Sequence, residues 1–325
     1  MKKLIPLLIL ILVLSACGQS NGSQKNAEEN GKVDVYTTVY PLTYFTERIG
    51  GDRVNVKSIY PAGSNEHTFE PTQQNMIALA EADLMFYVGL GLEGFISNAK
   101  KTLENEKVKF VATSDAISDE ELEAAGTHEE EHEEHEEHAE HEEDGHEGHN
   151  HGSTDPHVWI SPVLSQKLAL SIKDSLVEKD PEGKELYEEN YAQLIDELKQ
   201  LDQAFVDLSD RVTNKTFFVS HSAFGYIAEP YGFEQIAVAG LNSQDEPSQK
   251  ELTKIVDLAK EKNIKYIVFE QNVSSNLTEV IQKEVGAEAV QMHNLGVLTQ
   301  DNIDNKETYF TLMEKNLQVL ETVLK

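Results

Sequence analysis

The sequence predicts an α/β protein with two similar lobes, each built on a mostly parallel sheet, and one long rigid helix joining them. Strand-like apolar runs alternate with helical stretches in the first half of the chain, and the same alternation restarts after residue 212. An uninterrupted helical stripe separates the halves. The 325 residues suffice for two domains of ordinary size. Ligand sites in such sheets gather at the carboxyl ends of the strands.

The first 31 residues predict export. Residues 1–16 hold a lysine pair, an apolar run and a small-residue end, typical of a signal peptide and too short to span a membrane stably. Residues 14–17, Leu-Ser-Ala-Cys, match the bacterial lipobox, in which the cysteine is lipidated. Residues 17–31 are polar and predict a flexible tether. We therefore expect a protein outside the cytoplasm, anchored to the outer face of the cell membrane through Cys17.

Residues 32–180 are assigned to the N-terminal lobe. Val33 begins a β-rich run, and the Pro41 that follows it precedes an amphipathic stretch, which indicates a strand and then a helix. The remaining strands and helices repeat this order. The expected strands are 33–39, 54–60, 84–88 and 108–112, and the expected helices are 42–49 and 75–81.

Residues 181–212 predict the linking helix. Its apolar residues recur at spacings of four and three without an internal Gly or Pro: Tyr187, Tyr191, Leu194, Leu198, Leu201, Phe205 and Leu208. About 30 residues at 1.5 Å each would span roughly 45 Å, more than one small lobe needs. We therefore expect the helix to run along both lobes of a monomer; a coiled-coil dimerisation helix is the alternative.

Residues 213–325 are assigned to the C-terminal lobe, in which strands and helices again alternate. The expected strands are 216–219, 235–239, 266–269 and 289–292, and the expected helices are 223–229, 248–262, 277–285 and 306–324.

An acidic, histidine-rich loop is expected at residues 119–152, inside the N-terminal lobe. Positions 119–147 contain 16 Asp or Glu and no Lys or Arg. The histidines are His128, His132, His135, His138, His141, His146, His149 and His151. With almost nothing apolar to bury, the loop is expected to be disordered from about residue 120 and to collect metal in several weak sites. The formal charge of −31 argues against nucleic acid and for cations.

The run 128–132 satisfies the His-Glu-x-x-His pattern of zinc proteases. The pattern arises easily in a repeat of Glu and His, and no apolar positions would bury one face of such a helix. We therefore expect no enzymatic activity.

Three histidines are candidate metal ligands. His157 lies in Asp-Pro-His-Val-Trp-Ile-Ser-Pro, where a proline and an apolar patch should hold it still. His67 and His221 each follow an expected strand. Cys17 is the only cysteine, so a metal site must use histidines and carboxylates. Histidine ligands suit Zn²⁺, whereas Mn²⁺ prefers oxygen ligands. Binding should weaken in mild acid, because protons compete for histidines.

The lipobox and the motifs Glu-His-Thr-Phe-Glu-Pro, Asp-Pro-His-Val-Trp-Ile-Ser-Pro and Ser-His-Ser-Ala-Phe-Gly-Tyr resemble the zinc and manganese solute-binding lipoproteins of bacterial ABC importers, the ZnuA type in particular. The resemblance covers nearly the whole mature chain. It implies one metal in a cleft between two lobes, with His67 and His157 as ligands from the first lobe and His221 from the second. A histidine at the third position and a histidine-rich acidic loop resemble the zinc branch.

The fourth ligand departs from the family pattern. Many members place a carboxylate late in the second lobe, where this sequence has Gly296. Water or Glu66, which precedes the first histidine, is then expected as the fourth ligand, and His293 is a further candidate. The resemblance implies delivery of Zn²⁺ to an ABC permease and its ATPase. The alternatives are an adhesin-like surface lipoprotein with a structural metal site, and a manganese-binding member of the family.

Overall fold

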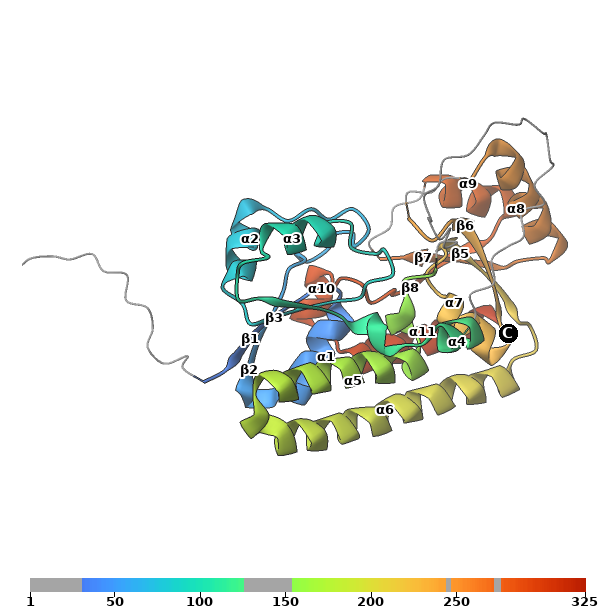
Figure 1. Cartoon of the computed structure of the whole chain (residues 1–325). Helices are drawn as coiled ribbons and strands as arrows, with labels where there is room; N and C mark the ends of the chain where they lie inside the picture. The colour runs from blue at the N-terminus through green and yellow to red at the C-terminus, as the bar shows by residue number, and fades with distance from the viewer. Residues whose placement is uncertain (1–30, 126–153, 244–246, 272–275) are drawn as a thin grey trace, which may run out of the picture. The chain divides into compact units, whose positions relative to one another are not determined.

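The framework of the protein is two sheets of parallel strands (Figure 1). The computed structural model describes residues 31–125, 154–243, 247–271 and 276–325. The strand orders are β2-β1-β3-β4 and β6-β5-β7-β8, and all six strand pairings among these described residues are parallel. The predicted two-lobed α/β class is confirmed. The strands are β1 (Val33–Thr37), β2 (Val54–Ser58), β3 (Leu84–Tyr87), β4 (Lys109–Ala112), β5 (Thr216–His221), β6 (Glu234–Ala239), β7 (Tyr266–Glu270) and β8 (Glu288–Met292).

Two interior strands, β3 and β5, are buried along their whole length. β3 lies between β1 and β4, β5 lies between β6 and β7, and every residue of both β3 and β5 is buried. Strands covered on both faces read as continuous apolar runs, which is why the sequence indicated them well. The strand ends differ from the predicted ends by a few residues. The difference matters at β5, because His221 is the last residue of this strand and pairs with Ala239 of β6.

Every helix predicted from the sequence has a counterpart in the structure. The helices of the first half are α1 (Tyr40–Gly50), α2 (Gln73–Ala80), α3 (Ile96–Thr102), α4 (Asp119–Ala124), α5 (Pro162–Lys179) and α6 (Lys184–Arg211). Those of the second half are α7 (Gly225–Ala228), α8 (Gln249–Glu261), α9 (Asn276–Val285), α10 (Gln300–Asp304) and α11 (Tyr309–Val323). Short 3₁₀ turns include η2 (Thr113–Ala116), η3 (Val158–Ile160) and η5 (Glu229–Tyr231). The helices α3, α4, α5 and α10 were not among the predicted helices.

The long helix α6 has 28 residues, which corresponds to about 42 Å. Six of the seven apolar residues of the predicted stripe are buried. The helix contacts α1 in the first half of the chain and η5 in the second, so it runs along both lobes as predicted (Figure 1). No helix in the described ranges is long and apolar enough to cross a membrane.

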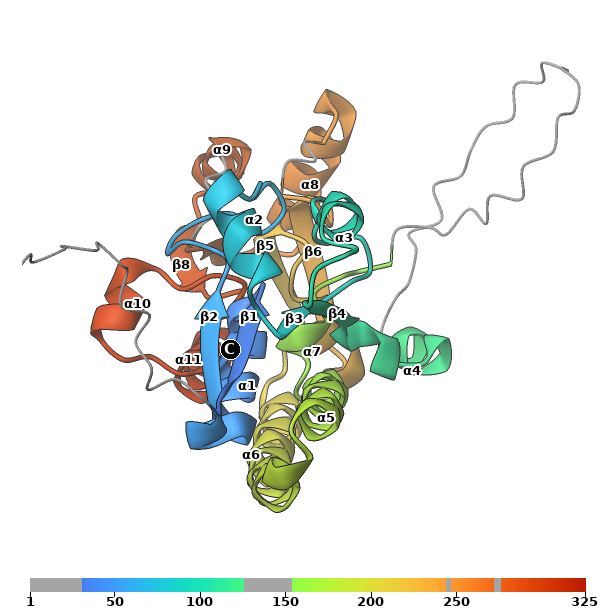
Figure 2. The same ribbon diagram turned by 60° about the vertical axis from the view of Figure 1, so that its left-hand side comes forward.

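Helix α5 lies side by side with α6 (Figures 1 and 2). Its buried apolar residues recur every four positions, at Leu164, Leu168, Ile172 and Leu176. The helix begins at a capping serine: the hydroxyl of Ser161 accepts a hydrogen bond from the Leu164 N–H, and Pro162 takes the first helical position. A serine followed by proline is a recognised helix start, so the sequence did carry a signal for α5.

The C-terminal helix α11 returns to the first half of the molecule. The ring of Tyr309 lies 5.0 Å from that of Phe45 in α1, edge to face. The hydroxyl of Tyr309 donates to the carbonyl of Trp159 at 3.1 Å. The described residues from Lys32 to Lys325 belong to one compact unit, and its main hydrophobic core draws residues from both halves of the chain. The two lobes therefore share one main hydrophobic core.

The start of the predicted acidic loop is ordered. In α4, the Ser118 hydroxyl accepts from the Glu121 N–H and the Glu121 carboxylate accepts from the Ser118 N–H, and Leu122 is buried. The expectation of disorder was wrong for residues 120–124, because a capping box and one buried leucine secure the helix. The remainder of the loop, with all eight of its histidines, lies outside the described residues, as does Cys17.

Candidate metal centre

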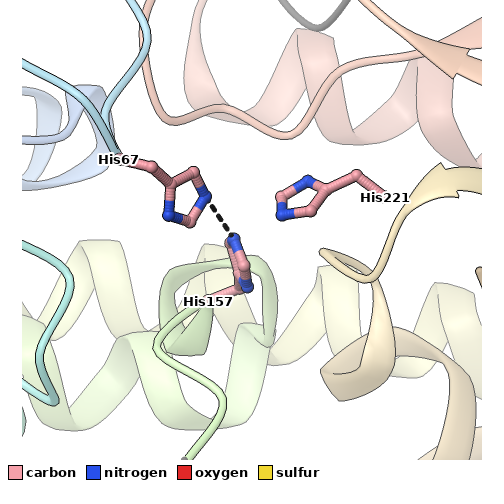
Figure 3. Close-up of side chains that lie close together, drawn as sticks. All are labelled: His67, His157 and His221. Atoms are coloured by element: carbon pink, nitrogen blue, oxygen red, sulfur yellow. Dashed lines mark hydrogen bonds between the residues drawn. The ribbon is translucent and has the colours of Figure 1, made fainter. Parts of the chain in front are cut away.

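Three histidines from distant parts of the chain meet between the two sheets (Figure 3). His67 comes from the loop after β2, His157 directly precedes η3, and His221 ends β5. Their ligand atoms all lie within 4.8 Å of one another. In the described part of the chain no other group of three His, Cys, Asp or Glu has this geometry.

The three rings are nearly equidistant. The centroid distances are 5.2 Å between His67 and His157, 5.1 Å between His67 and His221, and 4.9 Å between His157 and His221. Nε2 of His157 is 3.3 Å from Nε2 of His67. A zinc–nitrogen bond is about 2.0–2.1 Å long, so one ion can bind nitrogens at such separations after small ring movements.

His157 is fixed by its own loop. Its backbone N–H donates to Oδ1 of Asp155 at 2.9 Å, and the same oxygen lies 2.7 Å from its Nδ1. The carboxylate therefore keeps a proton on Nδ1 and leaves Nε2 to face the other histidines. The Trp159 ring packs against the imidazole at 5.3 Å, and both side chains are fully buried. Asp155 in turn fits over Gly225, where an added Cβ would lie 3.1 Å from its Oδ2.

His221 is oriented by a buried carboxylate from the neighbouring strand. Its Nδ1 lies 3.2 Å from both oxygens of Glu270 at the end of β7, and its Nε2 lies 3.0 Å from the carbonyl oxygen of Leu241. Both nitrogens thus face acceptors. Burial disfavours the charged ring, but the hydrogen bonds and the charge of Glu270 outweigh it and raise the pKa of His221 above its usual value. A metal can bind Nε2 only after that nitrogen loses its proton.

His67 is the partly exposed member of the group. Burial, and then the charges of His157 and His221, lower the pKa of His67 to about 3. The ring therefore stays neutral in physiological and mildly acidic solution. Its backbone N–H donates to the Asn65 side chain at 2.9 Å, and Asn65 donates to the hydroxyl of Ser243 at 3.1 Å. The loop that carries His67 is thereby tied to the second half of the chain.

Glu66 is close to the histidines but does not belong to the group. Its carboxylate is buried and accepts a hydrogen bond from Nδ2 of Asn294 at 2.8 Å. A Cβ added to Gly296 would lie 2.6 Å from Oε1 of Glu66, so the carboxylate fills the space that a side chain at residue 296 would need. Burial raises the pKa of Glu66 above its usual range.

His293 has no nitrogen available for a metal. Its Nδ1 accepts from the Leu295 N–H at 2.9 Å, and its Nε2 lies 2.9 Å from Oδ1 of Asn302. These two contacts fix the neutral tautomer with the proton on Nε2. Burial lowers the pKa of His293 to about 4. The ring therefore secures the loop before α10 and is not placed with the three histidines.

The sequence analysis did not identify Asp155 and Glu270, the carboxylates that face the histidine rings, or the side-chain amide of Asn294. Asp155 stands two residues before His157, and this spacing could have indicated it. Glu270 directly follows the predicted strand 266–269, which lies beside β5, so the strand-end rule that selected His221 applied to it too. Asn294 carried no such signal. Ligating histidines usually donate their second ring N–H to a carboxylate or carbonyl, and Asp155 and Glu270 have this position.

The sequence matches the family described as zinc-uptake complex component A periplasmic, ZnuA, over residues 35–323. The zinc-binding lipoprotein AdcA of Streptococcus pneumoniae (strain ATCC BAA-255 / R6) is 36% identical over 325 residues, which cover 99% of this chain and 61% of AdcA. The chain thus spans about three fifths of that relative. The high-affinity zinc uptake system protein ZnuA of Bacillus subtilis (strain 168) is 36% identical over 313 residues, or 96% of this chain and 94% of that protein.

Solved structures share the fold. The Zn(II)-bound ZnuA-like domain of Streptococcus pneumoniae AdcA matches with a TM-score of 0.72 and 31% identity, covering 90% of this chain and 99% of that one. The laminin binding protein Lmb of Streptococcus agalactiae, described as bifunctional with adhesin and metal transporting activity, matches with a TM-score of 0.74 and 27% identity, covering 90% and 100%. Because the family match runs from residue 35 to residue 323, the chain belongs to the ZnuA family of solute-binding transport proteins.

Proposed function

We propose that this protein captures Zn²⁺ outside the cytoplasm and delivers it to an ABC permease and its ATPase for uptake. The observation that carries the proposal is the group of three histidines, two of them fully buried and each of those two held by a carboxylate. Neutral imidazoles bind Zn²⁺ well, and carboxylates hydrogen-bonded behind them raise the basicity of the ligand nitrogens. The ion is cargo, and no reaction is catalysed.

The proposed ligands are Nε2 of His157 and one ring nitrogen each of His67 and His221, with Glu66 or a water as the fourth. Mn²⁺ would prefer more oxygen ligands than this set supplies, so the site suits zinc better than manganese. Loading requires Nε2 of His221 to leave the carbonyl of Leu241, which it contacts at 3.0 Å. A small structural rearrangement near Leu241 therefore accompanies zinc binding.

The anchor and partners belong to the same proposal. Lipidated Cys17 would hold the protein at the outer face of the membrane, beside the permease. The protein would act as a monomer. It would not bind nucleic acid, because its formal charge is −31. The domain bounds 32–180, 181–212 and 213–325 are our working division of the chain.

An adhesin is the second candidate, favoured by the likeness to Lmb. The experiment that separates the two is reversible metal exchange. A transport protein should lose and regain one Zn²⁺ per chain without unfolding, and the loaded and metal-free forms should differ in their affinity for permease-containing membranes. Elemental analysis after purification under limiting, mixed Zn²⁺ and Mn²⁺ identifies the cargo. A single manganese ion, or a metal removed only by unfolding, would overturn the proposal.

Zinc affinity is expected to fall as the pH drops from neutral into mild acid, because protons compete with zinc for the ring of His221. Its raised pKa means that a proton occupies the site first, and this proton must leave when zinc binds. His67, with a pKa of about 3, should not compete at all in this range. Calorimetry in buffers of different ionisation enthalpy should detect this proton as it is released on zinc binding. An affinity that stays flat from neutral pH to mild acid would contradict a histidine site.

Deleting residues 126–153 should leave one tight zinc site and remove several weak ones. The eight histidines of the predicted loop lie in this segment, whereas none of the three clustered histidines does. A tethered set of weak ligands raises the metal concentration near the tight site, so uptake from scarce zinc should also slow. Stoichiometry by competition with a chromophoric chelator provides the measurement. The control replaces the segment with a Gly-Ser stretch of equal length, and loss of the tight site in that control would show that the loop supplies a primary ligand.

A further inference from the structure

Asn294 links the two halves of the chain beside the three histidines. Its Nδ2 donates to Glu66 at 2.8 Å and to Glu270 at 2.9 Å, and both carboxylates are buried. Its Oδ1 accepts from Nε2 of Gln271 and from the N–H of Gly296, each at 3.0 Å. Every donor and acceptor of the side chain is therefore used in these bonds.

The orientation of this amide is fixed by its neighbours. The backbone N–H of Gly296 can only donate, so the atom that faces it must be the oxygen, and the NH₂ group must face the two carboxylates. One of those carboxylates, Glu270, orients His221. The other, Glu66, precedes His67 in the chain. One side chain therefore sets the positions of the carboxylate that orients a ligand and of a carboxylate that could bind the metal directly.

Gly296 provides the space into which Glu66 is drawn. The nearest atoms to a Cβ placed at residue 296 would be Oε1, Cδ and Oε2 of Glu66, at 2.6, 2.7 and 3.2 Å. Any side chain there would displace the carboxylate. The hydrogen bond from Asn294 and the missing side chain of Gly296 thus act together to hold Glu66 outside the group of three histidines.

We propose that Asn294 is a positioning residue that keeps the Glu66 carboxylate over Gly296 and off the bound metal, so that the fourth coordination position is left to an exchangeable ligand. The inference rests on the proposed function and refines its ligand set. An exchangeable fourth ligand makes the ion easier to transfer, because an incoming donor can replace a water without first displacing a buried carboxylate.

The experiment uses the full-length protein loaded with Co²⁺, whose visible absorption bands report coordination at the metal. Azide replaces a bound water but not a bound, buried carboxylate. Titrating the wild type with azide should shift the cobalt bands to saturation. In Asn294→Ala, the freed Glu66 should occupy the fourth position and the azide response should be lost. Gly296→Ala should have the same effect by displacing Glu66, while leaving Asn294 in place. Adding Glu66→Gln to Asn294→Ala should restore the response.

The outcomes separate the two proposals. If the wild type does not bind Co²⁺ or Zn²⁺ at the histidines, the proposed function fails and no cobalt spectrum is obtained. If the wild type binds Co²⁺ but ignores azide, or if both single variants respond like the wild type, the role of Asn294 is refuted while the metal site stands. A merely structural role of Asn294 would also be exposed, because Glu66→Gln could not rescue it.

Discussion

His157→Ala is expected to abolish tight zinc binding. The side chain is fully buried, its ring lies within 5.3 Å of the Trp159, His67 and His221 rings, and Asp155 holds it in one tautomer. Losing a hydrogen-bond partner of a metal ligand typically costs roughly 10–100-fold in affinity, and losing the ligand itself should cost more. Competition calorimetry against a chelator of known affinity provides the measurement.

Two further variants calibrate this result. Asp155→Ala removes the orienting carboxylate but keeps the ligand, so its affinity should lie between those of the wild type and His157→Ala. His138→Ala, in the predicted loop, should leave tight binding unchanged, because His138 is not among the three clustered histidines. Tight binding that survives in His157→Ala would show that the zinc lies elsewhere.

Trp159→Ala should strongly destabilise the folded protein. The indole is fully buried, and its Nε1 donates to the carbonyl of Asn294 at 2.7 Å, a bond between the two halves of the chain. Replacing a buried aromatic residue with alanine typically costs about 3–5 kcal/mol. The unfolding free energy from urea titration should fall by that amount. Far-UV circular dichroism must follow the transition, because Trp159 is the only tryptophan.

Milder substitutions separate packing from hydrogen bonding. Trp159→Phe retains much of the apolar volume but leaves the Asn294 carbonyl without its donor, which should cost about 1–3 kcal/mol. The matched control is Val163→Ala on α5, whose side chain is 47% exposed and should change stability by less than about 0.5 kcal/mol. If Trp159→Ala were as stable as this control, the stability of the shared hydrophobic core would not depend on the indole.

Local patterns in the sequence were sufficient for much of the fold. Strand β3 is buried on both faces and reads as a continuous apolar run, and β5 has such a run at residues 217–219. The apolar stripe of α6 runs from Tyr187 to Leu208, so its periodicity was plain. Helices α3 and α10 were missed because they have seven and five residues, too few for a periodic signal. Helix α4 was missed because its acidic composition masked a capping box.

The sequence by itself was sufficient to select the three histidines that cluster in the structure. Each of them stands in a short motif at or near the end of a strand or before a helical turn. Only the tertiary structure decided what surrounds them. The bond between Glu66 and Asn294 joins residues 228 positions apart, and the space over Gly296 that receives Glu66 exists only when the two lobes meet. Hydrogen bonds of this kind depend on distances between remote segments, and no local pattern of residues encodes those distances.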